Sequence, residues 1–174
     1  MVHVKSKGFD IVKWIANMLV ESKSMSPRVI IYCRTVTLAG WLYSKFLHFL
    51  KQSLPLDTCK LLMGLFHRMT LSKNKDIVLS SLTSNNHVMR LVIATSSLGC
   101  GVNTRGVKYV IHFGPSYDLV DYCQQIRRAG RDNQDQCHAI LNTYSKRSSK
   151  VSSDKKFYMK SSQCLRLTLY SRFV

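Results

Sequence analysis

The chain has 174 residues, 45% of them apolar, which is enough for one domain with a hydrophobic core and excludes disorder throughout. Its 26 Lys and Arg residues against 9 acidic ones give a formal net charge of +17, which favours a polyanionic partner, nucleic acid before a membrane surface. The apolar run 11–20 is interrupted by Lys13 and Asn17 and is far shorter than the roughly 20 residues of a membrane span, and no signal-type segment opens the chain. The composition therefore predicts an intracellular protein without a membrane partner.

The predicted elements begin with an amphipathic helix over residues 9–20, where apolar residues recur at helical spacing. Residues 28–33 form a β-branched run without polar alternation, which is typical of a strand covered on both faces of a parallel sheet. Thr35 can cap a following helix that reaches about Gln52 and turns one apolar face inward. These segments predict one β-α step.

The same alternation continues along the chain. We expect a second strand within residues 56–65, a helix over 71–82 with Ile77, Val78 and Leu82 buried, and a third strand at 90–95. A fourth strand at 108–113, a helix at 118–126 and a fifth strand at 136–142 follow. Strands that alternate with helices indicate an α/β fold, a parallel sheet flanked by helices.

A change of composition marks the end of this domain near residue 145. From Ser145 onward eight basic residues face the single acidic residue Asp154, before a helix-like segment over 157–173. We therefore expect a domain over 1–145 and a short basic helical tail over 146–174, which resembles a linker into a further part.

The densest candidate site is the segment Q-Q-I-R-R-A-G-R-D, residues 124–132, which places Arg127, Arg128 and Arg131 around a glycine. Three guanidinium groups so close repel one another and are tolerated most easily beside an anion such as phosphate. Gln124 lies three residues before the first arginine on the same helical face. A solvated basic helix end is an equal alternative on composition alone.

This segment resembles the Q-E-x-G-R-A-G-R-D motif VI of RecQ helicases, a branch of superfamily 2. Four further segments resemble RecQ motifs in the same order: V-I-I-Y-C-R-T at 29–35, F-H-R-M-T at 66–70, I-A-T-S-S-L-G-C-G-V-N at 93–103 and V-I-H-F-G-P-S at 110–116. The resemblance covers roughly residues 9–145 and implies the RecA-like second lobe of an ATP-dependent 3′-5′ DNA helicase, nuclear in a eukaryote and belonging to DNA repair and recombination.

The resemblance also implies roles for particular residues. Arg128 and Arg131 would be the arginine fingers on ATP phosphates, with Arg131 the main one, and Gln124 would couple that site to nucleotide and DNA. Gly99, Gly101 and Asn103 would line the nucleotide cleft, where the glycines permit a tight turn and Asn103 supplies a short polar side chain.

A second set of positions is implied for DNA. Arg34 and Thr35 follow the first strand and Thr95 and Ser96 the third, where relatives contact DNA phosphates and where parallel sheets bind ligands.

Zinc is not expected within this chain. Its six cysteines include no C-x-x-C pair, and such residues are mostly small buried hydrophobes in a reducing compartment. Cys164, in C-L-R, resembles the first zinc cysteine after the RecQ motor. Without partner cysteines it is a remnant ligand at most.

Two motifs of an ATPase are missing. None of the eight glycines is followed by lysine, as a Walker A loop requires, and the only glutamate, Glu21, is not part of a D-E-x-H box. We therefore expect ATP and magnesium to be bound mainly by a first RecA-like lobe, in cis or in trans, and no hydrolysis by this chain alone. DNA, single-stranded or forked, is the expected partner. Gln125 in place of Glu and Arg127 in place of Gly depart from the family, which keeps a nucleic-acid-binding module without motor activity as the alternative.

Overall fold

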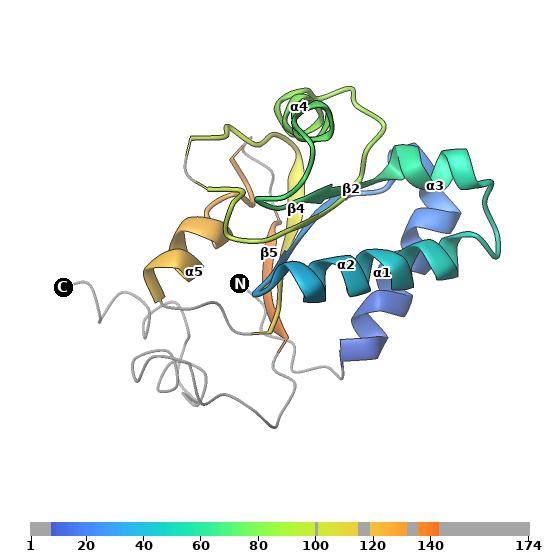
Figure 1. Ribbon diagram of the computed structural model, residues 1–174, viewed down its shortest axis with the longest axis horizontal. Coiled ribbons are helices and arrows are strands. Elements are labelled where there is room, and N and C mark those ends of the chain that lie inside the picture. The colour runs from blue at the N-terminus through green and yellow to red at the C-terminus, as the bar shows by residue number, and fades with distance from the viewer. Residues whose placement is uncertain (1–7, 100, 115–118, 132–135, 143–174) are drawn as a thin grey trace.

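The computed structural model describes residues 8–99, 101–114, 119–131 and 136–142. Five strands form one parallel sheet in the order β2-β3-β1-β4-β5 (Figure 1). The strands are β1 Arg28–Cys33, β2 Met63–Phe66, β3 Leu91–Ala94, β4 Val107–Phe113 and β5 His138–Asn142. The predicted parallel α/β sheet is confirmed, and its carboxyl ends share one edge.

Helices cover both faces of this sheet (Figure 1). One face carries α1 Gly8–Ser22, α2 Val36–Leu50 and α3 Leu56–Leu62, and the 3-10 turn η1 Lys23–Met25 follows α1. The other face carries α4 Ser72–Thr83 and α5 Leu119–Ile126. Successive residues of β1 alternate between the two cores, with Ile31 under α1 and α2 and Ile30 under α4 and α5. Burial on both sides explains the uninterrupted apolar runs of the strands.

The helix predicted after β1 forms for the expected reason. Thr35 has extended backbone angles, and its Oγ1 accepts a hydrogen bond from the Leu38 N–H at 3.1 Å. From there the buried residues Ala39, Leu42 and Phe46 recur at spacings of three and four. The N-terminus of α2 is thus fixed beside the carboxyl end of β1.

Two details of the predicted elements are wrong. Residues 56–62 form α3, and only Met63–Phe66 forms the strand β2. Pro55 precedes the helix, Asp57 lies in its first turn and Lys60 in its last, and the buried pair Cys59 and Leu62 follows helical spacing. Ile77 is 43% exposed, because α4 turns Val78, Ser81 and Leu82 toward the sheet instead.

The link between β3 and β4, residues 95–106, contains no helix among its described residues. Because β3 and β4 are parallel and flank β1, this link must return across β1 from the carboxyl edge to the amino edge of the sheet. Its contacts trace that path: Tyr32 Oη donates to the Leu98 carbonyl at 3.5 Å, and Arg28 Nη1 donates to the Arg105 carbonyl at 2.9 Å. We call this segment the 95–106 connection.

The predicted basic tail over 146–174 and the candidate zinc ligand Cys164 lie outside the described residues. Within the described part, no helix is long and apolar enough to cross a lipid bilayer.

Candidate functional site

Arg128 follows α5 and is buried, with 4% of its surface exposed. Its Nη1 donates to the Val102 carbonyl at 3.0 Å, and its Nη2 donates to the carbonyls of Leu98, at 3.2 Å, and Gly99. All three carbonyls belong to the 95–106 connection, whose described residues form no helix, so these carbonyls have no helical N–H partners there. Arg128 therefore points into the 95–106 connection, whereas an arginine finger of the kind that the resemblance implies would have to project outward to ATP.

Arg131 differs from Arg128 in exposure. Its side chain is exposed, while its Nε donates to the Arg127 carbonyl at 3.1 Å and its Nη1 donates to the Val102 carbonyl at 3.3 Å. The same Nη1 lies 3.5 Å from Oδ1 of Asn103. The structure thus brings Arg128, Arg131 and Asn103 together around one carbonyl, that of Val102. We call these three residues with Gly99 and Gly101 the arginine site.

Within the described residues, the guanidinium groups of the arginine site form hydrogen bonds only with uncharged groups. Every acceptor of Arg128 and Arg131 is an amide or backbone oxygen, and none is a carboxylate. Removing a guanidinium from water without an opposite charge is costly, so such a site favours an anion. Arg131 presents donors in a planar fork that matches phosphate oxygens.

Backbone geometry holds the arginine site to the sheet. Gly101 is exposed with φ of +101°, and Gly130 has φ of +74°, a region that side chains disfavour. The Gly130 N–H donates to the Val107 carbonyl at 3.2 Å, and Thr104 Oγ1 donates to the Arg128 carbonyl at 3.2 Å. Thr104 therefore positions the arginine segment.

The four residues predicted to contact DNA form a separate group. Arg34 and Thr35 follow β1, and Thr95 and Ser96 follow β3, so the parallel pairing of β1 with β3 brings them to one carboxyl edge. Thr35 and Ser96 are exposed and Arg34 is half-buried. Thr95 is 7% exposed, and its Oγ1 lies 2.9 Å from the Ser97 hydroxyl. This hydrogen bond stabilises the turn after β3.

Of the two adjacent glutamines on α5, Gln124 is exposed and Gln125 is buried. Oε1 of Gln125 lies 2.7 Å from Nε2 of His112, whose ring stacks on Tyr32 with centroids 5.5 Å apart. Sequence reasoning missed this pair, although the helical spacing of Gln125 from the apolar Tyr122 was a usable signal.

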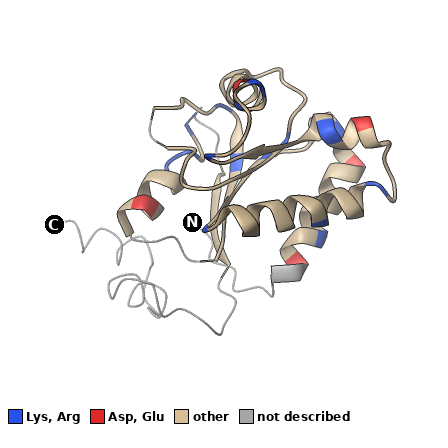
Figure 2. Ribbon diagram, viewed as in Figure 1, with Lys and Arg blue, Asp and Glu red and all other residues tan. Residues whose placement is uncertain are grey.

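The described charges are spread over several elements, and Figure 2 shows Lys and Arg on both layers of helices and at the sheet. No three His, Cys, Asp or Glu side chains come together as metal ligands in the described part of the chain. The arginine site therefore offers donors for an anion, and the carboxyl edge of the sheet offers hydroxyl groups.

A scan against protein families matches residues 10–133 to the helicase conserved C-terminal domain. The bifunctional 3′-5′ exonuclease/ATP-dependent helicase WRN of Mus musculus is 32% identical over 124 residues, covering 60% of this chain and 9% of that protein. The ATP-dependent DNA helicase Q-like 5 of Arabidopsis thaliana is 35% identical over 92 residues, covering 51% of this chain and 10% of that protein. The chain thus spans about a tenth of the length of these relatives.

Solved structures give the same fold. Helicase Lhr of Mycobacterium smegmatis, bound to single-stranded DNA and AMP-PNP, superposes with a TM-score of 0.60 at 25% identity, over 76% of this chain and 16% of that one. Domain 2 of the DEAD-box helicase Mss116p, bound to an RNA duplex, superposes with a TM-score of 0.61 at 15% identity, over 94% of this chain and 70% of that one. These likenesses confirm the predicted RecA-like arrangement of sheet and helices.

Proposed function

Because the chain belongs to the helicase conserved C-terminal domain family, the C-terminal lobe of superfamily 2 helicases, we propose that it is the second motor lobe of a RecQ-like ATP-dependent 3′-5′ DNA helicase. The similarity to the ATP-dependent helicase WRN and to the ATP-dependent DNA helicase Q-like 5 supports the assignment to RecQ-like DNA helicases in particular. The lobe closes on a first RecA-like lobe, supplied in cis or in trans, and opens again while single-stranded or forked DNA is held.

The observation that carries this proposal is an exposed arginine beside a buried one, with no carboxylate partner for either among the described residues. Arg131 acts as the arginine finger, since its fork is exposed and Asn103 and Val102 orient it. It compensates negative charge that develops on phosphate oxygens during phosphoryl transfer. Arg128 fixes the 95–106 connection under that finger, and it reaches phosphate itself only when it leaves its carbonyl partners.

The described residues fit a phosphate group better than a metal ion. Guanidinium and glycine N–H groups suit phosphate oxygens, whereas magnesium prefers carboxylates, of which the arginine site has none among the described residues. ATP supplies the phosphoryl group, and the first lobe holds it with magnesium. In this proposal Gln124, exposed on α5, couples the arginine site to nucleotide and DNA.

The carboxyl edge binds the DNA backbone. Thr35 accepts the Leu38 N–H, and its own hydroxyl hydrogen can still point to a phosphate oxygen. Ser96 and Arg34 add a hydroxyl and a charge, while Thr95 supports the turn. Such contacts read no bases, so binding is independent of sequence and weakens with salt.

The test is complementation. The chain is fused behind the first RecA-like lobe of a RecQ-type helicase, and phosphate release from ATP is measured with and without single-stranded DNA. DNA-stimulated hydrolysis should appear, and Arg131→Ala should lower its rate by about 10³-fold or more. Arg105→Ala removes another exposed arginine, which makes hydrogen bonds through its backbone to Arg28 and Leu82, and should leave the rate unchanged.

Restored hydrolysis that survives Arg131→Ala would refute the finger assignment. Salt-sensitive DNA binding without any complementation would instead favour the module without motor activity. Single-stranded RNA of the same length belongs in each assay, because stimulation by RNA alone would contradict the DNA helicase assignment.

A further inference from the structure

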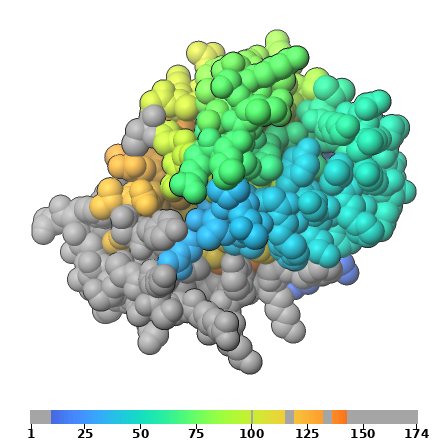
Figure 3. Space-filling model, viewed as in Figure 1, coloured from blue at the N-terminus to red at the C-terminus, as the bar shows by residue number. Residues whose placement is uncertain are grey.

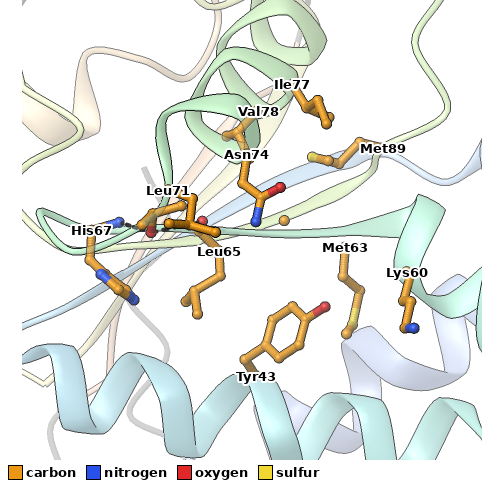
Figure 4. Close-up of a pocket in the computed structure, with 12 residues that line it drawn as sticks. Tyr43, Lys60, Met63, Leu65, His67, Leu71, Asn74, Ile77, Val78 and Met89 are labelled. Atoms are coloured by element: carbon orange, nitrogen blue, oxygen red, sulfur yellow. Dashed lines mark hydrogen bonds between the residues drawn. The ribbon is translucent and has the colours of Figure 1, made fainter.

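The loop of residues 84–90, which joins α4 to β3, is anchored in the protein by Met89. Met89 is 6% exposed, and its Sδ accepts a hydrogen bond from Ser81 Oγ of α4 at 3.3 Å. Its side chain lines a groove of about 440 Å³ together with Ile77 and Val78 of α4 (Figure 4). In Figure 3 the surfaces of α4 (green) and of α2 and α3 (blue to teal), which border this groove, face the viewer together. Because Met89 is fixed in this way, the neighbouring residues of the loop are held at the amino end of β3.

A buried arginine lies against this loop. Arg28, the first residue of β1, is 3% exposed. Its Nη2 donates to the carbonyls of Asn85 and His87, at 3.3 Å and 3.4 Å, and its Nη1 donates to the Arg105 carbonyl at 2.9 Å. These bonds hold a positive charge inside the protein and next to the loop, where water screens it less than it would at the surface.

Arg90, the last residue of the loop, adds a second guanidinium group. It is the neighbour of Arg28 across the sheet, because the Val29 N–H donates to the Arg90 carbonyl at 2.8 Å. The side chain of Arg90 is half-buried and donates no hydrogen bond, and its Nε is shielded from solvent without an acceptor. A buried N–H group without an acceptor costs free energy, so Arg90 is ready to receive the oxygens of a ligand.

His87 supplies a further donor close to both arginines. Its Nδ1 accepts the Met89 N–H at 3.1 Å, so the hydrogen of the neutral ring lies on Nε2. Burial lowers the pKa of His87, and the charges of Arg28 and then of Arg90 lower it further, which places both guanidinium groups near the ring. Among the described residues no carboxylate counteracts these two charges at His87. The three side chains therefore form a positive cluster that favours an anion.

We propose that Arg90, His87 and Arg28 form a second anion site, which binds a phosphate group at the amino end of β3. Arg90 donates to the phosphate oxygens through its guanidinium fork, and Nε2 of His87 donates to another oxygen. Arg28 keeps its carbonyl partners and contributes its charge from inside the protein. None of the three residues belongs to the arginine site or to the DNA edge, so the second anion site does not depend on the motor assignment.

The titration of His87 in the presence of sulfate tests the second anion site. Sulfate is the probe because, unlike phosphate, it keeps its charge over the whole range in which histidine titrates. The Cε1–H signals of the 174-residue chain are followed by NMR against pH, in sodium sulfate and in sodium chloride of equal ionic strength, and His87→Asn identifies the His87 signal. The pKa of His87 should be higher in sulfate by about 1, because the protonated ring holds the anion more strongly. The signal of His48, exposed on α2, should follow the same curve in both salts.

Two variants show whether Arg90 is responsible. Arg90→Gln removes the guanidinium fork, and the fold should tolerate it because the Arg90 side chain has no hydrogen-bond partner to lose. It should abolish the difference between the two salts at His87. Lys73→Gln, which removes an equal charge from an exposed position on α4, should leave that difference unchanged. A His87 signal that titrates alike in both salts in the parent, or a difference that survives Arg90→Gln, would overturn the proposal.

A fluorescein-labelled single-stranded oligonucleotide distinguishes a phosphate of the nucleic-acid backbone from a free phosphate. Its affinity is measured by anisotropy over a range of chloride concentrations. If the phosphate belongs to the backbone, Arg90→Gln should weaken binding by about three-fold or more and reduce the salt slope by about 0.7, the value for one contact. An equal loss with Lys73→Gln would assign the effect to net charge and exclude this source. Equal binding by the parent and Arg90→Gln, with the sulfate effect at His87 intact, would assign the site to a free phosphate or a phosphorylated small molecule.

Discussion

His112 and Gln125 meet in the interior between β4 and α5, where Nε2 of His112 lies 2.7 Å from Oε1 of Gln125. An amide oxygen only accepts, so Nε2 of His112 carries the hydrogen. The His112 ring lies between Tyr32 and Tyr122, with centroids 5.5 Å and 4.6 Å away. The pair therefore connects α5, which leads into the arginine site, to the centre of the sheet.

Replacing Gln125 should destabilise the fold. Gln125→Leu keeps a similar volume but leaves the buried Nε2–H of His112 without its acceptor, which costs about 1 to 3 kcal/mol of the free energy of unfolding. Urea unfolding followed by circular dichroism measures this change. Val120→Ala, at an exposed position of the same helix, should change it by less than about 0.5 kcal/mol. Equal effects of the two substitutions would contradict the role of the pair.

Arg128 should matter for stability as well as for any contact with phosphate. Arg128→Lys keeps the charge but cannot reach the carbonyls of Leu98, Gly99 and Val102 with one ammonium group, so we expect a loss of about 2 to 4 kcal/mol. Arg127→Lys, at the exposed neighbour, should be almost neutral in the same urea titration. An Arg128→Lys variant as stable as the parent would show that these bonds are not formed in solution.

Two glycines should respond to alanine in opposite directions. A Cβ on Gly64 would lie 2.6 Å from Met89 Sδ and 2.8 Å from Val78 Cγ2, both in the core, so Gly64→Ala should cost about 1 to 3 kcal/mol. A Cβ on Gly40, inside α2, meets nothing within 4 Å, and Gly40→Ala should gain about 0.5 to 1 kcal/mol. Thermal unfolding of the two variants side by side checks the signs.

The stability should also fall in mild acid. Burial lowers the pKa of His87 from its usual 6.5, and the nearby Arg28 and Arg90 lower it further. Nδ1 of His87 accepts the Met89 N–H at 3.1 Å, which requires the neutral ring. Because the unfolded chain binds this proton more readily, the contribution of His87 is complete above pH 6.5 and is lost as the pH falls through the lower folded pKa.

Two variants separate titration from hydrogen bonding at this position. His87→Asn does not titrate and keeps an acceptor for the N–H two residues on, so its melting temperature should decline less than that of the parent between pH 7 and pH 5. His87→Gln also lacks the titration, but its longer side chain suits that turn less well, and it should be less stable at pH 7. If the melting temperatures of both variants decline as much as that of the parent between pH 7 and pH 5, a group other than His87 causes the acid sensitivity.

Most of the fold could be predicted from the sequence because its strands are buried on both faces. The run 28–33 coincides with β1, and the runs at 90–95 and 108–113 contain or nearly match β3 and β4. The strand expected within residues 56–65 occupies only the last three of them, because the preceding residues 56–62 form α3. Apolar residues in so short a segment fit both helical and strand periods, and only Pro55 and the spacing of Cys59 and Leu62 distinguish the two.

The candidate site was predictable in position and not in geometry. The arginine segment and the glycines could be located through their resemblance to RecQ motifs, and Thr35 from its place before a helix. The burial of Arg128 depends on carbonyl groups that lie 26 to 30 residues earlier in the chain. No local pattern reveals such a contact, because it exists only once the 95–106 connection has crossed β1.

Because the 95–106 connection crosses β1, its length determines the positions of the guanidinium groups of Arg128 and Arg131. The 95–106 connection begins at the end of β3 and finishes at the start of β4, and both ends are fixed by pairing with β1. We expect that neither strand can shift to accommodate an inserted or deleted residue. Such a change should therefore displace the carbonyls that accept hydrogen bonds from Arg128 and the amide oxygen beside Arg131. A one-residue indel in this stretch would therefore shift both arginines without altering any residue of α5.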